Sequence, residues 1–147
     1  MARGLTARVE LHIEAPASDV WKALTDPEKI KKYMFGADVT SEWRTGSSVV
    51  IKGEWKGKPY EDKGTVIAVD PGRMLEYTHY SPLSGLPDSP ENYHTIKIEL
   101  ISRDAETDLV LSQDNNADED ERAHSEQNWK MMMEGMKKVA EETPRGC

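Results

Sequence analysis

NWKMMMEGMKK, residues 128–138, places four methionines and a tryptophan within eleven residues, among charged side chains. At about 100° per residue, an α-helix here would gather its apolar side chains within about one-third of its circumference: Trp129, Met132, Met133, Met136 and Ala140. Such a stripe predicts a helix with one face against the core. Leucine or isoleucine would favour one rigid packing, whereas methionine is flexible and polarizable. The stripe therefore has two interpretations, an ordinary core or a wall that adapts to a bound molecule.

Apolar and polar residues alternate through much of the chain that precedes this helix. The alternation predicts β-strands at residues 7–15, 47–55, 63–70, 73–80, 94–101 and 107–113. Residues 15–34 instead have helical spacing, and Pro16 and Pro27 suit the first turns of two short helices. The last helix is expected to be capped by Asn116 and to end before Pro144.

This order of elements predicts an α+β fold. One strand leads into two short helices, about six further strands follow, and a long C-terminal helix closes the chain. A long antiparallel sheet can bury its apolar face against that last helix.

Composition narrows the class of protein. The chain has 147 residues, which predicts one domain over 1–147 with an ordered core at about 5–142. Its formal charge is 19 − 27 = −8 and its basic residues are dispersed, so we expect no nucleic-acid partner. The single cysteine, Cys147, offers neither a disulfide framework nor a zinc site. Without an apolar N-terminal segment or a run of membrane-spanning length, we expect a cytoplasmic protein that does not insert into membranes.

Three segments carry a family resemblance: APASDVWKALTDPEKIKKY, KGTVIAVDPGRMLEYTH and the NW…MM..M helix. They resemble the START-like, helix-grip superfamily, often called SRPBCC. Within it they are most similar to bacterial relatives of the C-terminal domain of the activator of the ninety-kilodalton heat-shock chaperone's ATPase. The likeness runs from about Val9 to about Glu142, and YSPLSGLPDSPENYHT and LSQDNN look like signatures of one bacterial subgroup.

The resemblance implies a helix-grip fold, in which a curved antiparallel sheet of about six or seven strands wraps a long C-terminal helix around a cavity. Members of the superfamily bind hydrophobic small molecules, sequester toxins, act as cyclases or contact chaperones, so fold alone does not assign an activity. Relatives often carry tryptophan at the position of His79 and leucine at those of Met133 and Met136. These departures predict a cavity wall that is more polar at His79 and more flexible at Met133 and Met136.

Two histidines are expected to face each other across the sheet. If residues 73–80 pair with residues 94–101 so that Tyr77 opposes Ile96, then His79 opposes His94 on the same face. Cross-strand neighbours lie about 5 Å apart, which is close enough for polar contacts. A slip of one residue would turn both side chains outward.

A second hairpin would extend this polar row. If its turn centres on Arg103-Asp104, Ile96 opposes Leu111 and His94 opposes Gln113. The row of His79, His94 and Gln113 would then either anchor a loop or orient a polar group of an apolar ligand. Two histidines without a third ligand do not make a metal site, and the acidic run after Gln113 lacks the spacing of a calcium loop.

The leading interpretation is a binding module for a small hydrophobic or amphipathic molecule, held between the sheet and the C-terminal helix. The candidate ligand-binding residues are Trp43, Trp55, Tyr77, His79, His94, Gln113, Trp129, Met132, Met133 and Met136. One alternative is a chaperone-interacting module that uses an outer surface, and another is a hydrolase or cyclase acting on a hydrophobic substrate. No catalytic residue, metal or cofactor is assigned, and the protein is expected to be a monomer or a homodimer.

Overall fold

The computed structural model describes residues 5–82 and 85–142, to which every structural statement below refers. Its α-helices are α1 (Ala17–Thr25), α2 (Pro27–Tyr33) and α3 (Glu119–Glu142). Its strands are β1 (Leu5–Ile13), β2 (Asp38–Thr40), β3 (Ser48–Trp55), β4 (Lys58–Asp70), β5 (Met74–His79), β6 (His94–Arg103) and β7 (Glu106–Asn116), and a 3-10 turn, η2 (Pro90–Asn92), precedes β6.

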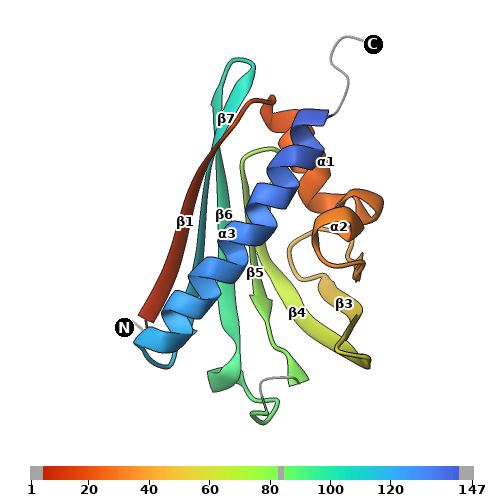
Figure 1. Ribbon diagram of the computed structural model, residues 1–147, viewed down its shortest axis with the longest axis vertical. Coiled ribbons are helices and arrows are strands. Elements are labelled where there is room, and N and C mark those ends of the chain that lie inside the picture. Colours follow the sequence, from red (N-terminus) through yellow and green to blue (C-terminus); the bar gives the residue numbers. More distant parts are fainter. Residues whose placement is uncertain (1–4, 83–84, 143–147) are drawn as a thin grey trace.

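The seven strands form one antiparallel sheet in the order β1-β7-β6-β5-β4-β3-β2. Figure 1 shows α3 lying across one face of the curved sheet, with α1 and α2 beside its C-terminal half. Each strand from β2 to β6 pairs with the strand that follows it in the chain, and β1 pairs with β7 at the other edge of the sheet. The predicted α+β helix-grip architecture, including the two short helices after the first strand, is confirmed.

The methionine stripe faces the sheet, as its helical spacing predicts. The buried side chains of α3 are Trp129, Met133, Met136 and Ala140. Met132 packs against this core from a partly buried position, while Met131 is 51% exposed. Branched residues of the sheet, such as Leu109 and Leu111, are fully buried opposite the helix. One face of the sheet and one face of α3 therefore share the apolar core.

The register of the two hairpins decides which polar side chains can meet. Between β5 and β6, Tyr77 pairs with Ile96 and His79 pairs with His94, as predicted. Between β6 and β7, however, Ile96 pairs with Gln113, so the prediction that His94 opposes Gln113 is wrong. The turn is formed by Asp104 and Ala105, one residue later than predicted, and Asp104 adopts a φ of 59°, which aspartate tolerates better than most residues. That shift moves the pairing by two residues and leaves each side chain on its predicted face.

The start of α3 also differs from the prediction. The helix begins at Glu119, and Asp118 caps it by accepting a hydrogen bond from the backbone N–H of Glu121 at 2.9 Å. Asn116, the predicted cap, is instead the last residue of β7 and is fully buried. Its side chain makes hydrogen bonds inside the protein, described below.

His12 on β1 lies between two carboxylates of β7 and should titrate above its ordinary range. Its Nδ1 is 2.7 Å from Asp108 Oδ1, and its Nε2 is 2.7 Å from Glu106 Oε1. The hydrogen bond to Asp108 is the main cause that raises the pKa of His12 above 6.5; desolvation opposes it and Glu106 adds to it. Because the folded state favours the protonated ring, its stabilising effect is complete below pH 6.5 and is lost as pH rises through the raised pKa.

A titration of the His12 ring by NMR should give a midpoint above 6.5, and Asp108→Asn should move that midpoint downward. A His12 midpoint at or below 6.5 in the unmodified protein would contradict the pairing.

Candidate functional site

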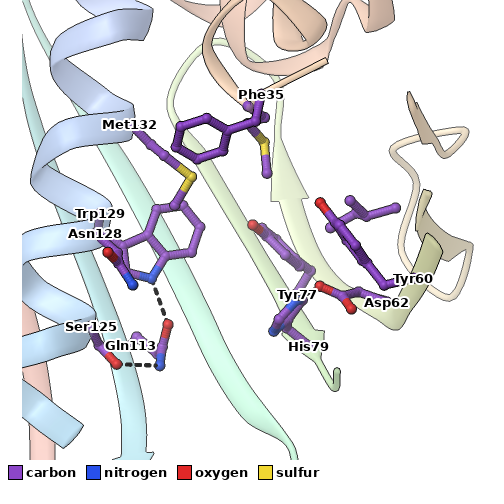
Figure 2. Close-up of a pocket in the computed structure, with 12 residues that line it drawn as sticks. Phe35, Tyr60, Asp62, Tyr77, His79, Gln113, Ser125, Asn128, Trp129 and Met132 are labelled. Carbon is purple, nitrogen blue, oxygen red and sulfur yellow. Dashed lines mark hydrogen bonds and ion pairs between the residues drawn. The ribbon is translucent and has the colours of Figure 1, made fainter. Parts of the chain in front are cut away.

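A cavity of about 310 Å³ lies between α3 and the sheet. It is lined by Met34, Phe35, Ile51, Tyr60, Asp62, Tyr77, His79, Gln113, Ser125, Asn128, Trp129 and Met132. Figure 2 shows these side chains converging from α3, from strands β3, β4, β5 and β7, and from the segment after α2. The volume is within the range of small-molecule pockets, and seven of the twelve lining residues are apolar or aromatic.

The wall formed by α3 is held by a hydrogen bond between Trp129 and Gln113. The indole Nε1 of Trp129 donates to Gln113 Oε1 at 2.5 Å, and Gln113 Nε2 donates to Ser125 Oγ at 3.2 Å (Figure 2). Both ends of the Gln113 amide therefore have partners within the protein. Gln113 orients the Trp129 ring, and both its amide oxygen and its amide nitrogen have hydrogen-bond partners without a ligand.

Asn116 completes this network behind Gln113. Its Nδ2 donates to the backbone carbonyls of Leu5 at 2.9 Å and Gln113 at 3.0 Å, and its Oδ1 accepts from Ser125 Oγ at 2.9 Å. Strands β1 and β7 and helix α3 are thereby joined at one end of the cavity. The polar row expected from the sequence is replaced here by a network of Gln113, Asn116 and Ser125.

The opposite wall carries an acidic and a basic side chain. His79 Nε2 on β5 lies 3.0 Å from Asp62 Oδ2 on β4, and Asp62 is only 9% exposed. The other carboxylate oxygen, Asp62 Oδ1, has no hydrogen-bond partner among the described residues. Burial, with a smaller contribution from the charge of Asp62, raises the pKa of the neighbouring Tyr60.

Tyr77 lies on the same wall as this pair (Figure 2). Burial raises the pKa of its hydroxyl, so the phenol remains protonated throughout the physiological range. A protonated phenol can both donate and accept a hydrogen bond. The wall thus combines an aromatic surface with three groups capable of polar contacts, His79, Asp62 and Tyr77.

The structure brings half of the predicted ligand-binding residues to this cavity: Tyr77, His79, Gln113, Trp129 and Met132. Trp43 and Met133 line a second cavity of about 30 Å³, which is too small for a ligand of drug-like size. Trp43 donates from Nε1 to the Thr25 carbonyl at 3.0 Å and meets the Tyr77 ring edge-on, with ring centroids 6.5 Å apart. These contacts give Trp43 a packing role.

The remaining predicted residues lie elsewhere. Met136 is fully buried and lines neither described cavity, and His94 Nδ1 lies 2.8 Å from the Asp114 carbonyl, also outside both. Trp55 belongs to β3, but its side chain falls outside the described part of the structure. The interior placement of Met136 follows from its position at the centre of the apolar stripe of α3.

Sequence reasoning missed Asp62, which is the acidic side chain of the lining. A signal was present, because Tyr60, Asp62 and Gly64 share one face of an alternating strand. Asp62 also pairs with Ile51 of β3, an inward-facing residue. An acidic residue at such a position is rare in a core and marks a candidate site.

Two classes of feature are not found among residues 5–82 and 85–142. No described helix is both long enough and apolar enough to cross a membrane. No described cluster of three or more His, Cys, Asp or Glu side chains could hold a metal ion.

Comparison with solved structures places the chain among proteins of the same fold. It is 51% identical to ChR145 from Cytophaga hutchinsonii, with a TM-score of 0.83, over 96% of this chain and 97% of that one. The Aha1 dimer from Colwellia psychrerythraea is 20% identical, with a TM-score of 0.73, over 94% and 97% of the two chains. CalU16 from Micromonospora echinospora is 18% identical, with a TM-score of 0.73, over 93% and 76%.

Comparison with curated proteins gives no match. A family model described as "Activator of Hsp90 ATPase homolog 1-like protein" matches residues 14–141, which include every residue that lines the cavity. The match covers most of the chain, and the chain therefore belongs to the Activator of Hsp90 ATPase homolog 1-like family.

Proposed function

We propose that this protein binds a small, mainly apolar molecule in the cavity between α3 and the sheet. The observation that carries the proposal is a cavity of about 310 Å³ with aromatic and thioether walls. Phe35, which is 62% exposed, and Asn128, also exposed, both line it, so the cavity reaches the surface between α2 and α3. A guest can enter there without unfolding the sheet.

Burial of apolar surface would supply the binding free energy, at about 25 cal/mol per Å² removed from water, before the costs of ordering. Met132 is suited to this task because it lies at the cavity and is only partly buried. Its unbranched thioether chain can occupy space when the cavity is empty and move aside for a guest.

Native mass spectrometry of the gently purified protein, compared with its denatured mass, tests the proposal. A carried ligand would appear as a reproducible extra mass that is lost on denaturation. The same ligand should raise the melting temperature with concentration, since it binds the folded state alone. A mass equal to that of the bare chain, together with no stabilisation by apolar compounds, would count against the proposal.

Blocking the mouth of the cavity should abolish binding while leaving the fold intact. Asn128→Trp adds a large ring at an exposed position that lines the cavity, whereas Gln127→Trp adds the same ring next to it, outside the described lining. With 1-aminoanthracene as a fluorescent probe, Asn128→Trp should weaken binding at least about tenfold through steric exclusion. Gln127→Trp should bind as the unmodified protein does, and equal binding by both variants would place the probe elsewhere.

The family description supports a second candidate, interaction with an Hsp90-type chaperone. Such an interaction would use an outer surface, so Asn128→Trp and Gln127→Trp should be retained equally on an immobilised chaperone. Retention of the unmodified protein without any binding of apolar compounds would favour this second function over the first.

A further inference from the structure

We infer that the cavity selects apolar molecules that carry a hydrogen-bond donor, such as a hydroxyl, and that Asp62 Oδ1 accepts that hydrogen bond. This inference rests on the proposed binding function and adds the chemical class of the ligand. It is carried by the buried, unpartnered carboxylate oxygen in the cavity wall.

Asp62 has unused acceptor capacity in an enclosed position. Its Oδ2 has His79 Nε2 at 3.0 Å, whereas Oδ1 has no partner among the described residues. An ionised carboxylate only accepts hydrogen bonds, and each of its oxygens has two lone pairs. Because an unpaired acceptor in a low-dielectric site is costly, Oδ1 requires a donor from outside the protein, either water or a ligand group.

The backbone holds Asp62 and His79 together on this wall. Lys63 on β4 forms an antiparallel bridge with Tyr80, with backbone hydrogen bonds of 3.0 Å and 2.8 Å. In that register His79 lies opposite Gly64. Asp62 is two residues before Gly64 in the sequence and therefore on the same face of β4. Figure 2 shows the His79 and Asp62 side chains lying close together beside Tyr77, with His79 Nε2 3.0 Å from Asp62 Oδ2.

The charges of the lining decide which donors fit. Within the described lining, Asp62 is the acidic side chain, His79 the basic one, and lysine and arginine do not occur. A ligand carboxylate or phosphate would be buried beside Asp62 without a cation of its own, which is strongly unfavourable. A neutral hydroxyl avoids that cost, and its oxygen can in turn accept a hydrogen bond from a group such as the Tyr77 phenol.

Binding of a ligand that lacks a donor would be penalised at the same atom. The ligand would pack beside Asp62 and leave Oδ1 without a donor. The donor-bearing compound makes one hydrogen bond to a charged group that the other compound lacks. The loss of such a bond should weaken binding about tenfold. The cavity should therefore discriminate between ligands of equal size by one O–H group.

Three compounds of similar shape test this inference by isothermal titration calorimetry: 2-naphthol, which donates; 2-methoxynaphthalene, which only accepts; and 2-naphthoate, which is anionic. The unmodified protein should bind 2-naphthol about tenfold more tightly than 2-methoxynaphthalene, and 2-naphthoate most weakly of the three. This comparison needs no variant, so it does not depend on any mutant folding.

Variants then assign the preference to Asp62. Asp62→Leu should bring the ratio of the two dissociation constants to about one, by weakening 2-naphthol and not 2-methoxynaphthalene. Asp62→Asn, which keeps the shape of the side chain and replaces a charged acceptor by a neutral one, should reduce the ratio and serves if the leucine variant does not fold. Glu61→Leu is the matched control: it lies next to Asp62 on β4, its side chain is 59% exposed, and the ratio should be unchanged.

The outcomes separate this inference from the proposed function. Equal binding of 2-naphthol and 2-methoxynaphthalene, or tightest binding of 2-naphthoate, would overturn the donor requirement while leaving binding in the cavity intact. A preference for 2-naphthol that survives Asp62→Leu would also overturn it. Failure of all three compounds to bind would overturn the inference together with the proposed function.

Discussion

Gly64→Ala is expected to destabilise the protein by about 3 kcal/mol and to lower its melting temperature by about 10 °C. A Cβ atom placed on Gly64 would lie 1.7 Å from the carbonyl oxygen of Thr78 and 2.6 Å from its carbonyl carbon. Both contacts are to backbone atoms, so no side-chain rotation can relieve them. The β4 and β5 backbones must separate at this point for the methyl group to fit.

The local hydrogen bonding shows how closely the two strands approach. The backbone N–H of Thr65 donates to Thr78 Oγ1 at 2.9 Å, so a side chain takes the place of the usual backbone acceptor. The pairing returns to backbone bonds at Lys63 and Tyr80. Separation of the strands here would also move His79 away from Asp62, so Gly64→Ala should weaken ligand binding as well as stability.

Thermal and urea unfolding of Gly64→Ala and Gly53→Ala would test the steric argument. A Cβ atom on Gly53 would lie 2.6 Å from the hydroxyl oxygen of Tyr60, which is the movable end of a side chain. The loss of stability should therefore be much smaller for Gly53→Ala. Equal losses in the two variants would show that the glycine effect comes from strand propensity, which is common to both positions.

Asn116→Ala is expected to cost about 3 kcal/mol of folding free energy, because it removes a fully buried polar side chain from the centre of a network. The substitution takes a donor from the carbonyls of Leu5 and Gln113 and an acceptor from Ser125. Each buried group left without a partner costs about 1–3 kcal/mol, and water has little access to replace the missing amide.

Ser125→Ala provides a graded comparison, since it removes one hydroxyl from the same network and should cost about 1 kcal/mol. Chemical unfolding followed by circular dichroism measures both losses. The NMR signal of the Trp129 indole N–H should shift in both variants, because each substitution removes a hydrogen-bond partner of Gln113. If the free energy of unfolding of Asn116→Ala lies within about 0.5 kcal/mol of that of the unmodified protein, the network contributes little to stability.

The elements of this fold could be predicted from the sequence because each depends on nearby residues. Alternation identifies the strands and their inward faces, and the helical spacing of Trp129, Met133 and Met136 identifies the buried side of α3. The first hairpin register was also predictable, since matching inward faces allow Tyr77 to oppose Ile96. The net charge of −8 and the presence of a single cysteine are read directly from the sequence.

Tertiary structure alone decided how the site is assembled. Alternation specifies which face of the sheet a residue occupies. A turn that lies one residue later shifts the pairing of the two strands by two residues and leaves every side chain on the same face. For this reason Gln113 pairs with Ile96 and not with His94. The partner of His79 is Asp62, and that contact depends on a close approach of two backbones at Gly64. The sequence by itself determined a sheet, a helix and an apolar stripe between them. Because cavities and polar contacts form between residues distant in sequence, only packing decided that five of the candidate residues share a cavity with Asp62.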